Sequence, residues 1–141
     1  MKLLVAGGAG FIGSNFIRYM LSTHPDYDIV NYDKLTYAGN PDNLKDIEEN
    51  SHYAFVHGDI TDLEKLNETI KKYNITHVIN FAAETHVDRS IHGGAKEFVL
   101  TNTLGVQMIL DSVKENKIEK FVNVSTDEVY GSLGLDEDRK F

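Results

Sequence analysis

Five apolar runs rich in valine, isoleucine and phenylalanine recur along the chain, and each is predicted to form a strand. The runs begin at Lys2 (KLLVAG), Asp28 (DIVNYD), Tyr53 (YAFVHGD), Thr76 (THVINFAA) and Lys120 (KFVNVST). They are continuous rather than alternating, which is typical of strands that are covered on both faces. We therefore expect a buried sheet with a layer of helices on each side.

Helical patterns separate these runs. They cover Phe11–Ser22, a weaker segment Asn43–Glu49, Asp62–Tyr73 and Ala95–Asn116. In the last segment the apolar residues fall mostly three or four apart, which predicts one apolar face packed on the sheet. These residues are Phe98, Gly105, Val106, Ile109, Leu110 and Val113.

The alternation of strands and helices predicts an α/β fold, a doubly wound parallel sheet of the Rossmann type with strand order 3-2-1-4-5. The last stretch, SLGLDEDRKF, is polar and contains no sixth strand. The sheet is therefore expected to be truncated before its sixth strand. Ligands of such sheets bind beyond the carboxyl ends of the strands, at the point where the strand order reverses.

Composition narrows the possible functions. The chain has 141 residues, 41% of them hydrophobic, which suits one domain over residues 1–141. A net charge of −8 without a basic cluster argues against nucleic acid as a partner. No cysteine is present, which excludes thiolate metal sites and favours a cytoplasmic location. No run is long enough to span a membrane, and the histidine spacing fits no common metal site.

A glycine-rich loop follows the first predicted strand. Gly7, Gly10 and Gly13 are spaced G-x-x-G-x-x-G directly before a predicted helix. Glycines there allow a tight turn and a close approach to a pyrophosphate, whose negative charge the helix amides favour. The alternative is a merely flexible turn, but the position between strand and helix favours a dinucleotide.

Asp33 ends the second predicted strand, about 20 residues after the third glycine. A carboxylate there accepts hydrogen bonds from an adenosine ribose and repels a 2'-phosphate, which favours NAD over NADP. Lys34 follows directly, and its cation would soften that repulsion. The alternative role for Asp33 is that of a turn-forming aspartate after a strand.

The third and fourth predicted strands also end in candidate cofactor contacts. Ile60 would lie against adenine and Asp59 would bond its amino group, unless Asp59 or Thr61 only caps the next helix. Ala82 and Ala83 are small enough to let the ribose and nicotinamide pass over the backbone.

The segment STDEVYG follows the fifth predicted strand. Asp127 and Glu128 are adjacent carboxyl groups, and two such groups in different surroundings can hold different protonation states. That arrangement suits a reaction in which one proton is removed and another delivered. The alternative is that Ser125, Thr126 and Asp127 cap a short helix beginning at Glu128.

Taken in order, the glycine loop and the segments NYDKLTYAGN, GDIT, FAAETHVDRSI, TNTLGV and VSTDEVYGS resemble the extended short-chain dehydrogenase/reductase family. The resemblance covers essentially the whole chain. It implies NAD-dependent dehydration of a nucleotide sugar, with dTDP-glucose favoured and a 4-keto-6-deoxy sugar as product. Related GDP-mannose dehydratases typically carry Thr-Ser-Glu in the last motif.

The resemblance also implies residue roles. Asp127 matches the acid that protonates the departing C6 hydroxyl, Glu128 the base that removes the C5 proton, and Thr126 a hydroxyl bonded to the C4 oxygen. Thr85 matches a substrate contact. The matching NAD contacts are Phe11, Ile12, Asp33, Lys34, Leu35, Thr36, Asp59, Ile60, Ala82, Ala83 and Thr101.

The family's Tyr-x-x-x-Lys pair does not occur in these residues. The chain therefore resembles an N-terminal fragment without the sugar-nucleotide domain, and we expect it to have little or no dehydratase activity alone. The full-length form is expected to be a homodimer, as is usual in the family. Two alternatives stay open: a UDP-sugar 4,6-dehydratase or epimerase, and a non-catalytic dinucleotide-binding module.

Overall fold

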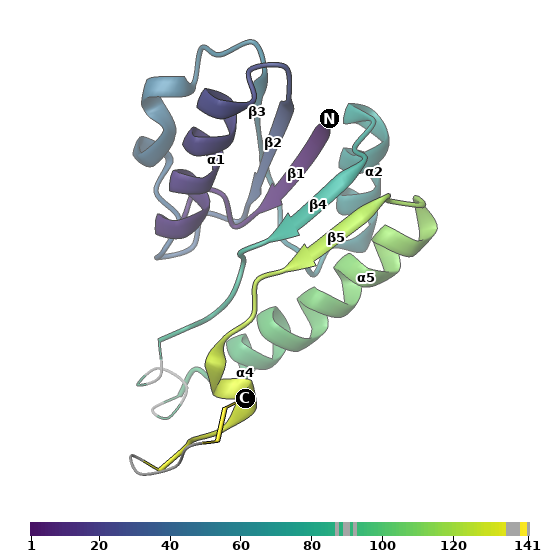
Figure 1. Ribbon diagram of the computed structural model, residues 1–141. Helices are drawn as coiled ribbons and strands as arrows, with labels where there is room; N and C mark the ends of the chain where they lie inside the picture. The colour runs from purple at the N-terminus through teal and green to yellow at the C-terminus, as the bar shows by residue number, and fades with distance from the viewer. Residues whose placement is uncertain (87, 89–90, 92, 135–138, 141) are drawn as a thin grey trace.

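The structure is a computed structural model that describes residues 1–86, 88, 91, 93–134 and 139–140. Its centre is a parallel sheet with the strand order β3-β2-β1-β4-β5 (Figure 1), which confirms the predicted order. The strands are β1 (Lys2–Ala6), β2 (Asp28–Asp33), β3 (Tyr53–His57), β4 (His77–Asn80) and β5 (Lys120–Asn123). The order reverses between β1 and β4.

Helical segments connect the strands close to the predicted positions. The α-helices are α1 (Phe11–Thr23), α2 (Leu63–Tyr73), α4 (Ala95–Phe98) and α5 (Val106–Glu115). The weak helix after β2 is a 3₁₀ helix, η1 (Pro41–Ile47), and another 3₁₀ helix, η3 (Asp127–Tyr130), follows β5. Between α4 and α5 lies a π-helix, η2 (Val99–Gly105), which was not predicted. Together α4, η2 and α5 form one continuous helical stretch (Figure 1).

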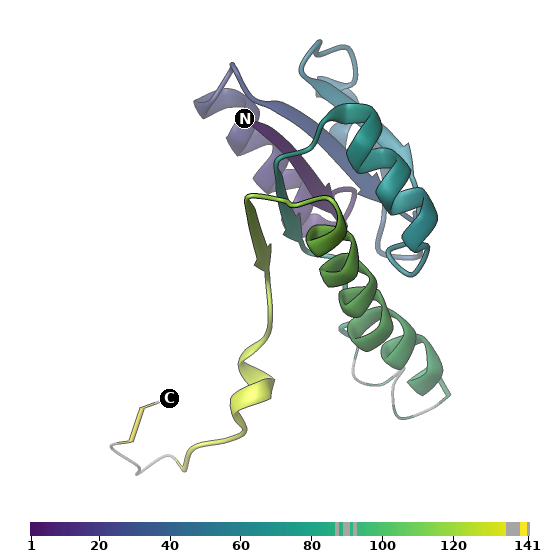
Figure 2. The same cartoon turned by 90° about the vertical axis from the view of Figure 1, so that its right-hand side faces the viewer.

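Side chains of alternate residues in β1 point to opposite faces of the sheet, and each face has its own apolar cluster. Leu3 and Val5 pack with Ile17 and Leu21 of α1. On the other face Leu4 joins a cluster that includes side chains from α2 and α5. Figures 1 and 2 show α1 on one side of the sheet and α2 with α5 on the other. The fold is therefore doubly wound, as predicted.

The expectation that every strand is covered on both faces is wrong for β5. Val122 is aligned with Ile79 of β4 on the α1 side of the sheet and is 41% exposed. Helix α1 crosses from β1 to β2, so it covers the other half of the sheet (Figure 1). In the described part of the chain, no helix lies over this face of β5.

The apolar face predicted for α5 is only partly correct. Ile109 is 1% exposed and joins the cluster under β1 and β4, but Leu110 is 44% exposed. Adjacent helical residues point about 100° apart, so the two side chains cannot share one narrow face. Ser112 is fully buried instead, and its hydroxyl donates to Asn67 of α2 at 2.6 Å.

Asp62 caps the N-terminus of α2, because its side chain accepts a hydrogen bond from the amide of Lys65 at 3.0 Å. The cap is therefore neither Asp59 nor Thr61, the two residues that the sequence suggested for this role. Among the described residues no helix is both long and apolar enough to cross a membrane.

Candidate functional site

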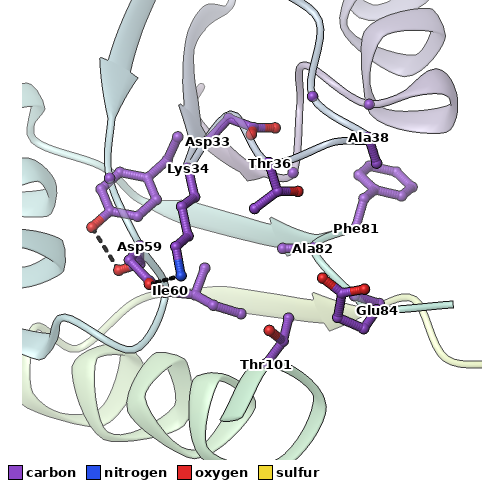
Figure 3. Close-up of a pocket in the computed structure, with 16 residues that line it drawn as sticks. Asp33, Lys34, Thr36, Ala38, Asp59, Ile60, Phe81, Ala82, Glu84 and Thr101 are labelled. Carbon is purple, nitrogen blue, oxygen red and sulfur yellow. Dashed lines mark hydrogen bonds and ion pairs between the residues drawn. The ribbon is translucent and has the colours of Figure 1, made fainter. Parts of the chain in front are cut away.

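A cleft lies at the carboxyl end of the sheet, beside the point where the strand order reverses. Its walls come from the loops that follow β1, β2, β3 and β4, and from η2 (Figure 3). Parallel strands bring these loops together because all their carboxyl ends meet at one edge. Ten of the predicted cofactor residues line it: Gly7, Gly10, Asp33, Lys34, Thr36, Asp59, Ile60, Ala82, Ala83 and Thr101.

The loop glycines serve two different purposes. Gly7 has φ +75°, and a side chain there would come within 2.5 Å of the backbone of Ala82. A side chain at Gly13 would overlap the carbonyl oxygen of Gly7. These two glycines are required by the fold itself, because the glycine loop packs closely on the segment after β4 and on the first turn of α1.

Gly10 is different, because the fold has room for a side chain there. The nearest atom to a Cβ at this position is the carbonyl oxygen of Gly7, at 3.4 Å. Gly10 lines the cleft and is the N-cap of α1, whose first turn has no side-chain cap and no acidic residue. A side chain at Gly10 would therefore take up space in the cleft next to free helix amides, where an anion is favoured.

Asp33 connects the glycine loop to the end of β2. It is 8% exposed, and its two carboxylate oxygens accept hydrogen bonds from the amide of Ala9 at 2.9 Å and of Leu35 at 2.8 Å. The bond from Leu35 stabilises a turn after the strand, which is the alternative role that the sequence suggested for Asp33. Leu35 has φ +54°, a conformation that is costly for a bulky residue and that this bond helps to hold.

Asp59 forms an ion pair with Lys34 in the cleft, with 2.6 Å between Nζ and Oδ2 (Figure 3). Its other oxygen accepts from the amide of Thr61 at 2.9 Å. Burial alone would raise the pKa of Asp59, but the bonds from Lys34 and Thr61 outweigh it and lower that pKa below its ordinary value. The Asp59 carboxylate is therefore ionised at neutral pH.

A buried tyrosine supports the loop that carries Asp59. Burial raises the pKa of Tyr32, so its hydroxyl stays protonated and donates to the carbonyl oxygen of Asp59 at 3.0 Å. A side chain at Gly58 would overlap the ring of Tyr32. Ile60, the next lining residue, is 5% exposed and closely packed on Gly105 of the long helix.

The loop after β4 is joined to η2 by an exchange of two hydrogen bonds. The amide of Glu84 donates to the side chain of Asn102 at 2.8 Å, and the Asn102 side chain donates to the Glu84 carbonyl at 2.8 Å. Thr101, the neighbour of Asn102, lines the cleft near Ile60 (Figure 3). π-Helical turns are frequent at functional sites, and this one presents Thr101 to the cleft.

Sequence reasoning did not name six lining residues, which are Tyr32, Ala38, Gly39, Gly58, Phe81 and Glu84. Most of them are sequence neighbours of residues that were predicted to contact the cofactor. They could have been predicted by the same rule, that ligands bind beyond the carboxyl ends of the strands. Ala38 and Gly39 could not be placed from sequence, because the path of the loop after Asp33 depends on its hydrogen bonds to the glycine loop.

The remaining predicted residues do not line the cleft. Phe11 and Ile12 are 82% and 62% exposed in the first turn of α1, and Leu35 is half-buried. Thr85 and Thr126 are exposed. The side chains of Asp127 and Glu128 lie outside the described part of the structure. The backbone of these two residues begins η3, one residue earlier than the capping alternative expected.

Comparison with known proteins identifies relatives. The sequence model of the family described as GDP-mannose 4,6 dehydratase matches residues 4–140. The low-salt glycan biosynthesis protein Agl12 of Haloferax volcanii is 49% identical over 94% of this chain and 42% of its own length. A dTDP-glucose 4,6-dehydratase of Streptomyces niveus is 46% identical over 94% of this chain and 40% of its own length.

Among solved structures, a dTDP-glucose 4,6-dehydratase from Bacillus anthracis in complex with NAD superposes with a TM-score of 0.88 at 44% identity. The match covers 99% of this chain and 42% of that structure. The chain thus spans about two fifths of the length of the relatives it matches.

Proposed function

The chain belongs to the GDP-mannose 4,6 dehydratase family, and we propose that it forms the NAD-binding part of an NAD-dependent nucleotide-sugar 4,6-dehydratase, a lyase, acting on dTDP-glucose. The proposal rests on one observation: Gly10 and Asp33 line the same cleft, beside the point where the strand order of the sheet reverses. Residues 1–141 would then be an incomplete Rossmann domain of that enzyme, without its substrate domain.

The residues of the cleft fit a dinucleotide. The space that Gly10 leaves open adjoins the uncapped amides of α1, which suits a pyrophosphate. Asp33 would meet the adenosine ribose, and Ile60 would lie against adenine. The solved relative from Bacillus anthracis contains NAD, which supports this choice of cofactor.

Bound NAD would supply an acceptor for the hydride of the sugar C4 and, after water has left, a donor of that hydride to C6 while C5 regains a proton. Oxidation at C4 makes the C5 proton acidic, because it then lies next to a ketone. Glu128 would remove this proton, and Asp127 would donate a proton to the departing C6 hydroxyl, so that water leaves across C5 and C6. Thr126 would bond the C4 oxygen, and Thr85 would contact the substrate.

The substrate is proposed as dTDP-glucose for two reasons. Relatives named dTDP-glucose 4,6-dehydratase are 46% and 44% identical to this chain. The last motif reads Thr126-Asp127-Glu128 rather than the Thr-Ser-Glu typical of GDP-mannose dehydratases. The alternatives are a UDP-sugar 4,6-dehydratase or epimerase and a non-catalytic dinucleotide-binding module.

The decisive experiment uses the complete gene product that contains this chain. It is incubated with dTDP-glucose and with UDP-glucose in separate reactions, and formation of the 4-keto-6-deoxy sugar is followed in each. Product from dTDP-glucose alone is expected. Product from UDP-glucose, or C4 inversion without loss of water, would replace the proposal by the first alternative. Binding of NAD without turnover of either sugar would favour the second.

Three further properties are proposed with this function. The enzyme would be cytoplasmic, which the lack of cysteine supports. It would act on a nucleotide sugar without a nucleic-acid or membrane partner, in keeping with the net charge of −8. The full-length form would be a homodimer, which measurement of its mass in solution can test.

A further inference from the structure

The ion pair between Lys34 and Asp59 ties together the ends of two neighbouring strands. Lys34 directly follows β2 and Asp59 lies just beyond β3, and the two strands pair in parallel with Asp33 aligned to His57. The distance between Nζ and Oδ2 is 2.6 Å, and both residues line the cleft (Figure 3). The pair therefore lies beside Asp33, where the adenosine ribose is proposed to bind.

Asp59 is the fixed partner of this pair. Its side chain is 28% exposed, and its second oxygen accepts from the Thr61 amide at 2.9 Å. Its carbonyl oxygen is held by the Tyr32 hydroxyl at 3.0 Å. The side chain of Lys34 is 58% exposed. The carboxylate thus determines where the ammonium group rests.

The charges at this end of the cleft do not balance. Asp33 and Asp59 contribute two carboxylates, and Lys34 contributes one ammonium group. His57 also faces Lys34, through a bond of its ring to the Lys34 carbonyl oxygen at 3.0 Å. With the lysine held by Asp59, no cation is left in this group to compensate Asp33. If Asp59 were neutral, Lys34 would be free to do so.

This balance matters for the choice between NAD and NADP, which differ by a phosphate on the adenosine ribose. A phosphate monoester carries roughly two negative charges at neutral pH. Lys34 is adjacent to Asp33 in sequence, so its ammonium group would be the natural counter-ion of a phosphate bound there. To reach the phosphate, however, the lysine must leave a partly buried carboxylate without its partner, which is unfavourable.

We propose that Asp59 is a specificity-determining residue, which excludes NADP by holding Lys34 away from the 2'-phosphate position. This inference rests on the proposed dinucleotide site. It assigns the discrimination to two residues acting together, with Asp33 as the repelling group and Asp59 as the residue that withholds the compensating cation.

The test measures the dissociation constants of NAD and NADP by calorimetry for the complete gene product that contains this chain and for its variants. Asp59→Asn keeps the shape of the side chain and an acceptor for the Thr61 amide but releases Lys34. We expect the preference for NAD to fall about tenfold, since Lys34 is 58% exposed and a unit charge about 4 Å from a phosphate contributes that order of free energy in water. Unchanged preference would overturn the proposal.

The double variant Asp59→Asn with Lys34→Met separates the two possible causes. If the released lysine binds the phosphate, the tenfold gain in NADP affinity relative to NAD disappears in the double variant. If the gain persists without the lysine, the charge of Asp59 itself repels NADP and the proposal is wrong. Asp46→Asn is the matched control, because it breaks an exposed ion pair of equal length, 2.6 Å to Arg18, whose two residues do not line the cleft.

Lys34→Met alone gives an answer that does not depend on the folding of the Asp59 variants. Because the lysine is already engaged by Asp59, we expect this change to alter the affinities for NAD and NADP by similar factors. A selective loss of NADP affinity would show that Lys34 already serves the phosphate, and would overturn the proposal. Failure of the unaltered complete gene product to bind either dinucleotide would instead refute the proposed cofactor site itself.

Discussion

The Asp33 carboxylate accepts a hydrogen bond from the amide of Ala9 at 2.9 Å, so the residue at the end of β2 holds the glycine loop after β1 in place. The same carboxylate accepts from the Leu35 amide at 2.8 Å and lines the cleft. Asp33 therefore has a structural role before any ligand is bound, and its substitution is expected to change both folding stability and binding.

We expect Asp33→Asn to lower the free energy of unfolding by about 1–3 kcal/mol, because its amide group can replace only one of the two acceptors. NAD affinity should fall several-fold in the same variant. Denaturant titration and calorimetry measure the two effects. Asp46→Asn, at an exposed ion pair with Arg18, should cost less than about 1 kcal/mol. Unchanged NAD affinity in Asp33→Asn would contradict the ribose-binding role.

Alanine substitutions should distinguish the glycines that the fold needs from the one that a ligand needs. Gly10→Ala adds a side chain that the protein can accommodate, so stability should change by less than about 1 kcal/mol while NAD affinity falls at least tenfold. Gly13→Ala places the same group against the Gly7 carbonyl and should destabilise the fold. Thermal denaturation and calorimetry on both variants check this. NAD binding by Gly10→Ala at full strength would argue against a pyrophosphate at this position.

Low pH should destabilise the fold, in part because Asp59 becomes protonated. Its pKa is lower in the folded chain than the ordinary value of 3.8, so the ionised side chain stabilises the fold at pH values above that ordinary pKa. This stabilisation is lost as pH falls through the lower folded-state pKa. The urea midpoint of Asp59→Asn should therefore decline less steeply than that of the unaltered chain below about pH 4. Parallel curves would indicate that the ion pair with Lys34 does not contribute to stability.

The proposed base can be tested in the complete gene product. Glu128→Gln should leave hydride removal from C4 intact but stop removal of the C5 proton, so reduced nicotinamide accumulates without release of water. Absorbance of the reduced cofactor and analysis of the sugar follow the two steps. Glu115→Gln, on α5 in a surface ion pair with Lys71, is the control and should turn over normally. Full turnover by Glu128→Gln would remove this residue from the mechanism.

Much of the fold could be predicted from the pattern of apolar runs. The five strands and their order follow from it, because right-handed crossovers leave few arrangements for alternating strands and helices. The cleft could be placed as well, since Asp33 ends β2, and Asp59 and Ala82 follow the ends of β3 and β4. These predictions depend on the local periodicity of apolar residues and on the alternation of strands with helices, both of which can be recognised in the sequence.

Other features could not be predicted because they arise from contacts between distant segments. Gly105 of the π-helix η2 packs closely against Ile60, a residue far away in the sequence, and no spacing in the sequence indicates the π-turn. The ion pair of Lys34 with Asp59 depends on the parallel pairing of β2 and β3. Sequence reasoning treated Lys34 as a free cation, whereas the structure shows that it is already neutralised.

The paired hydrogen bonds between Glu84 and Asn102 also constrain how the cleft can move. Two bonds of 2.8 Å, made in opposite directions, resist both sliding and rotation of the β4 loop against η2. The two bonds therefore favour movement of the β4 loop and η2 together when the cleft changes shape. A substitution at Asn102 would remove the hydrogen bonds between the β4 loop and η2 without changing any residue that lines the cleft.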